Sequence, residues 1–314
     1  MPADRGGLDP KGPVAETMAE LWWLMLALGA LVFVGVVVLL VLGLFRGRRD
    51  VESTPTPDTG RSSRWLIGGG VVMPVLVLVV VFGATVAAMR DVPTEAPAGA
   101  LVVEVIGHQW WWEVRYPEEG ITTANELHVP VGRAVSIELT SADVIHSFWV
   151  PALGGKLDAL PDGTNTLVLE ADEPGEFHSE CAEFCGLQHA NMAVVVVAES
   201  QDRFASWVDA QRGPAAEPGD ATAQRGREVF LGDEAQCAAC HTVRGTAADA
   251  TDGPDLTHVG SRPTIGAGTL SNTQMNLADW VRDPHTAKDG VGMPASSLTD
   301  EQLEAVVAYL ETLE

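Results

Sequence analysis

The sequence has 314 residues and a formal net charge of −24, with 19 Lys and Arg against 43 Asp and Glu. This length suggests about two or three domains and excludes a disulfide-stapled miniprotein, because the chain is long enough to bury a real core. The acidity excludes a nucleic-acid-binding protein, since phosphate contacts need a basic face. The mean hydropathy is nevertheless +0.12, so apolar and acidic residues must lie in different parts of the chain.

The charge divides at residue 90. The net charge is 0 for residues 1–64, +1 for 65–90, −15 for 91–213 and −10 for 214–314. All of the net negative charge therefore follows residue 90.

Two uncharged runs of 25 residues precede that point, at 21–45 and 65–89. A bilayer core of roughly 30 Å needs about 20 helical residues, so each run is long enough to span it. A signal peptide is the alternative for the first run, but that run is too long and is followed by Arg46 rather than by a small-residue cleavage site. We expect a two-helix membrane anchor over residues 21–90. Processing of an N-terminal segment stays open.

The flanking charges predict how the anchor is oriented. The loop 46–64 carries five arginines, whereas the tail 1–20 carries only two basic residues; they are Arg46, Arg48, Arg49, Arg61 and Arg64 against Arg5 and Lys11. The positive-inside rule places the loop in the cytoplasm. The tail and everything after residue 90 then lie on the outer face of the membrane, which we expect to be a bacterial plasma membrane.

Within the segment 91–210, residues 101–199 are expected to form an all-β unit. Polar and apolar residues alternate over Val135–Leu139, as in a half-buried strand, while Thr166–Leu169 and Ala193–Ala198 are short apolar runs typical of inner strands. A short helix around Trp207 is expected to close this unit.

The rest of the chain changes character. Residues 211–223 have the composition of a linker. Near the end of 224–314, apolar residues recur at the spacing of one helical face, which predicts a final helix. Thr299 with Gln302 predicts a capping box at the start of that helix. This region has few apolar residues for a core, so a bulky cofactor at its centre is expected.

The motif Cys237-Ala-Ala-Cys240-His241 matches the attachment pattern of a c-type haem. The two thiols would bind the haem covalently, and His241 would be an axial ligand of the iron. Met293, just before the final helix, is the expected sixth ligand, with Met275 as the rival. A redox disulfide beside a chance histidine is the alternative. The segment resembles class I cytochrome c.

A second pair of cysteines lies in Cys181-Ala-Glu-Phe-Cys185-Gly-Leu-Gln-His189-Ala-Asn-Met192. Thiolates, an imidazole and a thioether are soft ligands that favour copper, and two thiolates are enough to bridge two copper ions. The second imidazole should come from another strand, and His146, 35 residues before Cys181, is the candidate. A Cys181–Cys185 disulfide would leave the other residues unexplained.

Taken together, these segments resemble subunit II of the haem–copper cytochrome c oxidases, in the version with a cytochrome c domain fused to the C-terminus. The resemblance covers nearly the whole chain. It implies a multidomain membrane protein: two transmembrane helices, a cupredoxin-like Greek-key β-sandwich and a small all-α cytochrome c domain.

The resemblance also implies roles for individual residues. In a dinuclear copper A centre, the bridging ligands would be Cys181 and Cys185, the terminal ligands His146 and His189, and the weak ligands Met192 and the Glu183 carbonyl oxygen. The Glu183 side chain would help to bind a magnesium ion shared with subunit I. Trp110 would be the electron-input residue, whereas Trp111 and Trp112 are expected to pack at a membrane interface.

The implied activity is electron transfer, with no catalytic residue in this chain. Electrons would pass from an external cytochrome or a quinol–cytochrome c reductase to haem c, to copper A and to subunit I, where oxygen is reduced to water and protons are translocated. Subunit III is a further expected partner. A nitric oxide reductase subunit and a stand-alone membrane-anchored carrier are the alternatives, while quinol oxidase subunits II lack the copper ligands.

The cytoplasmic start of the second helix departs from the family pattern. Many members carry a glutamate near the cytoplasmic start of the second helix, whereas Arg61–Gly68 has no acidic residue, and Glu52 and Asp58 are the nearest.

Acidity on the copper domain attracts a basic cytochrome in the family. Here the fused cytochrome region is itself acidic, so the linker and local contacts must hold it against the copper domain.

Overall fold

The computed structural model describes residues 6–47, 59–233 and 235–314. These form two compact units: residues 16–93, and residues 6–15 together with 94–314. The remaining positions of the predicted tail and loop, among them Arg5, Arg48, Arg49, Glu52 and Asp58, lie outside the described residues.

The first unit is helical. Its helices are α1 (Pro13–Gly47), α2 (Thr59–Ile67), the π-helical turn η1 (Gly68–Val72) and α3 (Met73–Asp91). Two stretches, Pro13–Arg46 and Ser63–Asp91, are long and apolar enough to cross a membrane. Helix α1 begins before the uncharged run, so part of the predicted tail is helical. A charged residue ends an apolar run in the sequence, but it does not end a helix.

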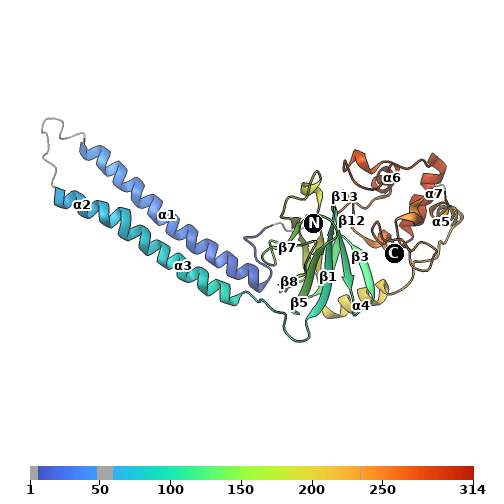
Figure 1. Ribbon diagram of the computed structural model, residues 1–314, viewed down its shortest axis with the longest axis horizontal. Helices are drawn as coiled ribbons and strands as arrows, with labels where there is room; N and C mark the ends of the chain where they lie inside the picture. The colour runs from blue at the N-terminus through green and yellow to red at the C-terminus, as the bar shows by residue number, and fades with distance from the viewer. Residues whose placement is uncertain (1–5, 48–58, 234) are drawn as a thin grey trace. The chain divides into compact units, whose positions relative to one another are not determined.

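The β-domain of the second unit contains a five-stranded sheet of order β3-β2-β1-β5-β8, visible in Figure 1. Its strands are β1 (Leu101–His108), β2 (Trp111–Tyr116), β3 (Ile121–Ala124), β5 (Val135–Ser141) and β8 (Asn165–Leu169). Strands β1 and β5 pair in parallel although they are distant in sequence, so the chain crosses over between them. Alternate residues of β1 are buried, so one face of this sheet forms the core.

Two three-stranded sheets complete the sandwich, with the orders β10-β6-β7 and β4-β11-β9. Their strands are β4 (Glu126–Pro130), β6 (His146–Trp149), β7 (Leu157–Ala159), β9 (Gly175–His178), β10 (Glu180–Cys181) and β11 (Val195–Glu199). Helix α4 (Gln201–Gln211) follows and buries Phe204 and Val208. The predicted cupredoxin-like sandwich is confirmed.

Trp112 corrects one expectation. Its side chain is completely buried in the core of the sandwich rather than at a membrane interface, and its ring packs edge-on against Phe148 at 5.7 Å between centroids. The apolar alternation of β2 places Trp112 on the inner face of the sheet. Trp111, on the opposite face, stacks on His108.

The C-terminal region is mostly helical. Its elements are α5 (Ala221–Leu231), η3 (Cys237–Ala239), η4 (Val259–Ser261), α6 (Gln274–Arg282), η5 (Pro284–Thr286), α7 (Asp300–Glu311) and the short pair β12 (Thr264–Ile265) and β13 (Leu270–Ser271). Helices α5 and α7 pack closely, because a Cβ atom on Gly226 would lie only 1.9 Å from the Ala305 carbonyl oxygen. The predicted Thr299–Gln302 capping box is present.

The segment between α4 and α5 is shorter than the predicted linker. Helix α5 begins at Ala221, because the Asp220 carboxylate accepts hydrogen bonds from two backbone N–H groups of its first turn. The Ala215 N–H donates to the Arg244 carbonyl at 2.9 Å, and the Arg244 guanidinium donates to the Gln211 carbonyl. The linker therefore packs along the cytochrome region.

Candidate copper and haem sites

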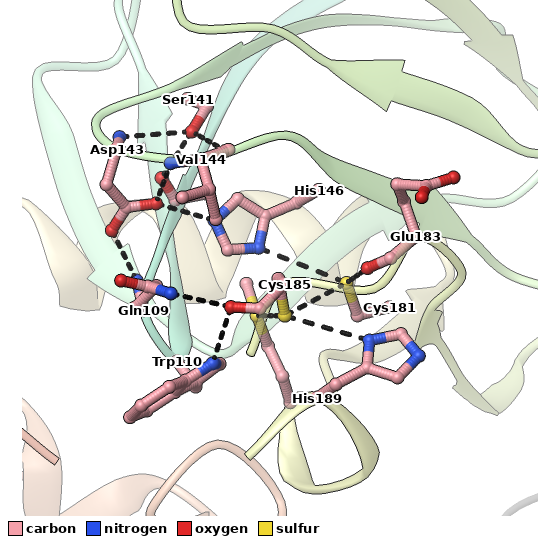
Figure 2. Close-up of polar contacts among 12 residues, drawn as sticks. Gln109, Trp110, Ser141, Asp143, Val144, His146, Cys181, Glu183, Cys185 and His189 are labelled. Atoms are coloured by element: carbon pink, nitrogen blue, oxygen red, sulfur yellow. Dashed lines mark hydrogen bonds and ion pairs between the residues drawn. The ribbon is translucent and has the colours of Figure 1, made fainter. Parts of the chain in front are cut away.

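Three segments of the β-domain converge on the predicted copper ligands. His146 begins β6, and β6 pairs antiparallel with β10, which places Cys181 opposite Phe148. The loop after β10 carries Cys185 and passes through the turn η2 (His189–Asn191). Figure 2 shows the side chains of His146, Cys181, Cys185 and His189 pointing toward one another.

The sulfur and nitrogen atoms are arranged around the two cysteines. The Cys181 and Cys185 sulfurs, both free thiols, are 3.8 Å apart. His146 Nδ1 lies 4.0 Å from the Cys181 sulfur, and His189 Nδ1 lies 3.7 Å from the Cys185 sulfur. Each thiol thus has one imidazole beside it. The Met192 sulfur, 3.9 Å from the Cys185 sulfur, and the Glu183 carbonyl oxygen, 3.3 Å from the Cys181 sulfur, complete the cluster.

Asp143 fixes the orientation of the His146 ring. The carboxylate lies 2.8 Å from His146 Nε2, which leaves Nδ1 facing the cysteines. Gly107 lies directly beside the same ring, since a Cβ atom there would approach it to 2.7 Å. Burial lowers the pKa of His146, partly opposed by Asp143. Burial works to raise the pKa of Asp143, but hydrogen bonds from His146 and two backbone N–H groups bring it below its ordinary value.

The Cys185 thiol of this cluster holds its proton firmly. Burial, with the neighbouring Cys181, raises the pKa of Cys185 to about 12. Since a thiol must lose its proton to bind a metal, a cation arriving here would displace it. The donor set of sulfur and imidazole fits soft ions such as copper.

Trp110 is joined directly to the cluster. Its indole N–H donates to the Cys185 carbonyl at 3.0 Å, and the Gln109 side-chain amide donates to the same oxygen at 2.6 Å. The predicted electron-input residue is therefore one hydrogen bond from a predicted ligand. The Glu183 side chain, by contrast, is exposed, and only its backbone carbonyl faces the cluster.

The predicted haem attachment residues lie around the turn η3. Cys237 and Cys240 are free thiols, and His241 follows with Nδ1 2.8 Å from the Pro254 carbonyl oxygen. That contact leaves Nε2 available as an iron ligand. Burial lowers the pKa of His241, opposed by the bond to Pro254, which favours the neutral, metal-binding form.

A glycine makes room for the His241 ring. A Cβ atom on Gly253 would lie 2.7 Å from it. Met293 is half-buried in the segment before α7, whereas Met275 on α6 is 72% exposed. The residues present therefore fit a covalently bound haem.

Sequence reasoning missed several residues that support these sites. Asp143 lies three residues before His146, and that spacing is a usable signal. Gln109 and Gln188 gave no signal, because their roles depend on pairings between distant segments. The same is true of Lys288, a lysine that is only 2% exposed.

The fold and these sites define a class: a protein with two helices suited to a membrane, a copper-type β-sandwich and a haem-type helical domain. Residues 119–199 match the family described as "Cytochrome C oxidase subunit II, periplasmic domain", and residues 223–314 match "Cytochrome c".

Relatives cover the chain as a whole. Cytochrome c oxidase subunit 2 of Alkalihalophilus pseudofirmus is 39% identical over 98% of this chain and 90% of its own. The protein of the same name from Bacillus sp. (strain PS3) is 34% identical over 85% of this chain and 79% of its own. The crystal structure of the periplasmic domain of subunit II of cytochrome oxidase from Bradyrhizobium japonicum is 32% identical, with a TM-score of 0.37, and covers 38% of this chain and 97% of that one.

The chain belongs to the cytochrome c oxidase subunit II family, whose members are subunits of an oxidoreductase. Family membership implies a copper A site in the β-domain, haem c in the C-terminal domain and a subunit I partner.

Proposed function

We propose that this chain is the electron-input subunit of a respiratory cytochrome c oxidase. Its C-terminal domain receives electrons from an external donor, and its β-domain delivers them to subunit I for reduction of oxygen to water coupled to proton translocation. The proposed order of domains is an outer tail, a two-helix anchor with a cytoplasmic loop (46–64), a copper A domain (91–210), a linker that ends where α5 begins at Ala221, and a cytochrome c domain.

One observation carries this proposal: two free thiols 3.8 Å apart, each with an imidazole nitrogen within 4.0 Å. In this assignment Cys181, Cys185, His146 and His189 would hold two copper ions, with Met192 and the Glu183 carbonyl oxygen as weaker donors. Cys237 and Cys240 would hold the haem covalently, and His241 and Met293 would be the ligands of its iron. When bound, the copper pair and the haem each take up and release single electrons.

The protein's part is to hold these ligands still. Asp143 and Gly107 fix the His146 ring, and the Cys185 side chain is buried together with Met192. A rigid, water-excluded ligand set changes little between oxidation states, which favours fast electron transfer. Trp110, bonded to the Cys185 carbonyl, offers a short covalent and hydrogen-bonded route into the cluster.

The orientation follows from the same proposal. The arginine-rich loop 46–64 faces the cytoplasm, and the acidic domains face outward. The exposed Glu183 side chain is free to share a magnesium ion with subunit I. Subunit III and a cytochrome or quinol–cytochrome c reductase donor complete the set of partners.

Purification of the tagged full chain from its own membranes tests the function. We expect a large multi-helix haem–copper subunit to co-purify and the complex to consume oxygen with a reduced c-type donor. The Cys185→Ser variant should lose this activity while keeping its haem c spectrum. Consumption of nitric oxide instead of oxygen would identify a nitric oxide reductase subunit, and isolation of the chain alone would identify a stand-alone carrier.

A further inference from the structure

Lys288 belongs to the cytochrome domain (224–314) and is buried where this domain contacts the copper domain (91–210). It is 2% exposed, and its ammonium nitrogen donates to the carbonyl oxygens of Trp110 at 2.8 Å, Asn191 at 2.5 Å and Gly266 at 2.9 Å. Gly266 belongs to the turn between β12 and β13, whereas Trp110 and Asn191 belong to the copper domain. The Lys288 side chain thus joins three parts of the molecule: the predicted electron-input residue Trp110, the copper-binding loop (Cys181–Met192) and the cytochrome domain.

The environment of Lys288 is matched to its chemistry. Lysines are almost never fully buried unless they are paired, and an ammonium group has three N–H donors. Here three carbonyl oxygens meet those donors. Burial lowers the pKa of Lys288 to about 7, and the nearby Cys185 opposes this shift only in part. The other two lysines of the sequence, Lys11 and Lys156, are not buried.

Further contacts surround Lys288 at the same junction. The Gln188 side-chain amide, from the copper-binding loop, donates to the Asp289 carbonyl at 2.7 Å, and the Ala193 N–H donates to the Ala267 carbonyl at 3.1 Å. Gly290, with φ of +80°, lies so close that a Cβ atom there would be 3.1 Å from Leu187. All of these contacts join residues within 185–193 of the copper domain to residues within 266–290 of the cytochrome domain.

The charges of the two domains do not explain this junction. Residues 91–213 and 214–314 are both strongly acidic, so their overall fields repel. The contacts at Lys288 instead use backbone carbonyl oxygens at hydrogen-bond distance, where long-range repulsion matters less. An ion pair at a separate point, Arg262 with Glu126 at 3.8 Å, adds one opposite-charge contact between the two domains.

We propose that Lys288 is a docking residue: it fixes the segment 266–290 of the cytochrome domain onto Trp110 and the copper-binding loop. The inference rests on the proposed function, because it assigns the bound cytochrome domain as the partner that reaches Trp110. In this arrangement the loop that leads to Met293 is held against the electron-input residue. An external donor then delivers its electron to the cytochrome domain and does not contact Trp110 itself.

Amine footprinting of the full chain, matured with haem and copper in its membrane complex, tests the docking directly. An acylating reagent should modify Lys156 readily and Lys288 at least tenfold more slowly, as mass spectrometry of the peptides would measure. Lys288 is protected only while the domains are docked, because its amine is enclosed by both. Equal labelling of Lys156 and Lys288 would overturn the proposal.

A variant gives the second measurement. Lys288→Met keeps the length of the side chain but loses all three hydrogen bonds, so the docked state should open more often. Hydrogen exchange at the Ala193 amide, which is bonded to the other domain, should become roughly tenfold faster. Lys156→Met, an equal change of charge at an exposed site, should leave it unchanged. Unchanged exchange in Lys288→Met would contradict the proposal.

The haem and copper spectra separate this inference from the proposed function. If both spectra are present and Lys288 is labelled freely, the docking is wrong while the electron-transfer role stands. If Lys288 is protected but the copper band is missing, the docking stands and the copper assignment fails. The footprint of the unsubstituted chain also remains decisive if Lys288→Met folds poorly.

Discussion

Asp143 decides which nitrogen of His146 faces the cysteines. We expect Asp143→Asn to weaken copper binding about 10- to 100-fold, because an amide no longer supplies the charged acceptor that holds the ring. Competition with a copper chelator would measure the affinity. Asp162→Asn, the same change at an exposed turn position, is the matched control, and equal affinities in the two variants would refute the role of Asp143.

Met293 and Met275 separate the haem ligand from its rival. Met293→Leu should leave haem covalently attached to Cys237 and Cys240 but change the low-spin spectrum and lower the reduction potential, since a thioether ligand raises it. Met275→Leu should leave both unchanged, because that side chain is 72% exposed. The opposite result would assign Met275 as the ligand.

At the residue scale, the sequence points to the candidate ligands but not to the residues that support them. The cysteine motifs are local, so Cys181 with Cys185 and Cys237 with Cys240 could be recognised by spacing alone. His146 needed an argument from chemistry, and the strand pairing of β6 with β10 brings it beside Cys181. Lys288 could not be found, because its three acceptors come from segments up to 178 residues away.

At the scale of elements, strands β4 and β11 enclose a group of charges around His128. Its ring lies 3.2 Å from Glu199 and 3.8 Å from Glu126, and it stacks on Trp207 of α4. Burial lowers the pKa of His128, but the two carboxylates outweigh it and raise that pKa above 6.5. The Tyr116 hydroxyl bonds to the His128 backbone, and Arg262 faces Glu126.

The raised pKa gives a pH dependence of stability. The folded state binds the His128 proton more tightly than the unfolded state does, so the contribution of this proton to stability is complete below pH 6.5 and is lost as the pH rises through the raised pKa. The stability advantage of the unsubstituted chain over His128→Asn should therefore shrink from pH 6 to pH 8, measured by denaturant unfolding in detergent. An advantage that grows with pH would contradict this account.

Elements with strong local signals were predictable. The signals for the strand β5 and for the capping box of α7 depend on neighbouring residues, and both features are present. The start of α1 and the end of the linker were less well predicted. The length of an apolar run predicts a membrane span but does not show where its helix begins. The cap at Asp220 begins α5 inside a segment of linker composition.

At the scale of the whole molecule, the acidity has two different consequences. An external basic donor should be attracted by the acidic domains, so its turnover should slow as salt rises through the range where the Debye length shortens from ~30 Å to ~10 Å. The contacts at Lys288 are short and mostly uncharged on the acceptor side, so the footprint of Lys288 should not change over the same range. Stopped-flow donor oxidation would measure the first effect. A donor rate that is independent of salt would count against steering.

The central claim is that the Cys181–Cys185 cluster binds two copper ions that share an electron. The most direct measurement is the copper content and near-infrared spectrum of the purified, copper-loaded chain. We predict two copper ions for each haem c and a mixed-valence absorption band that disappears in Cys181→Ser. A single copper ion, or two without that band, would contradict the dinuclear site and with it the proposed path of electrons through this chain.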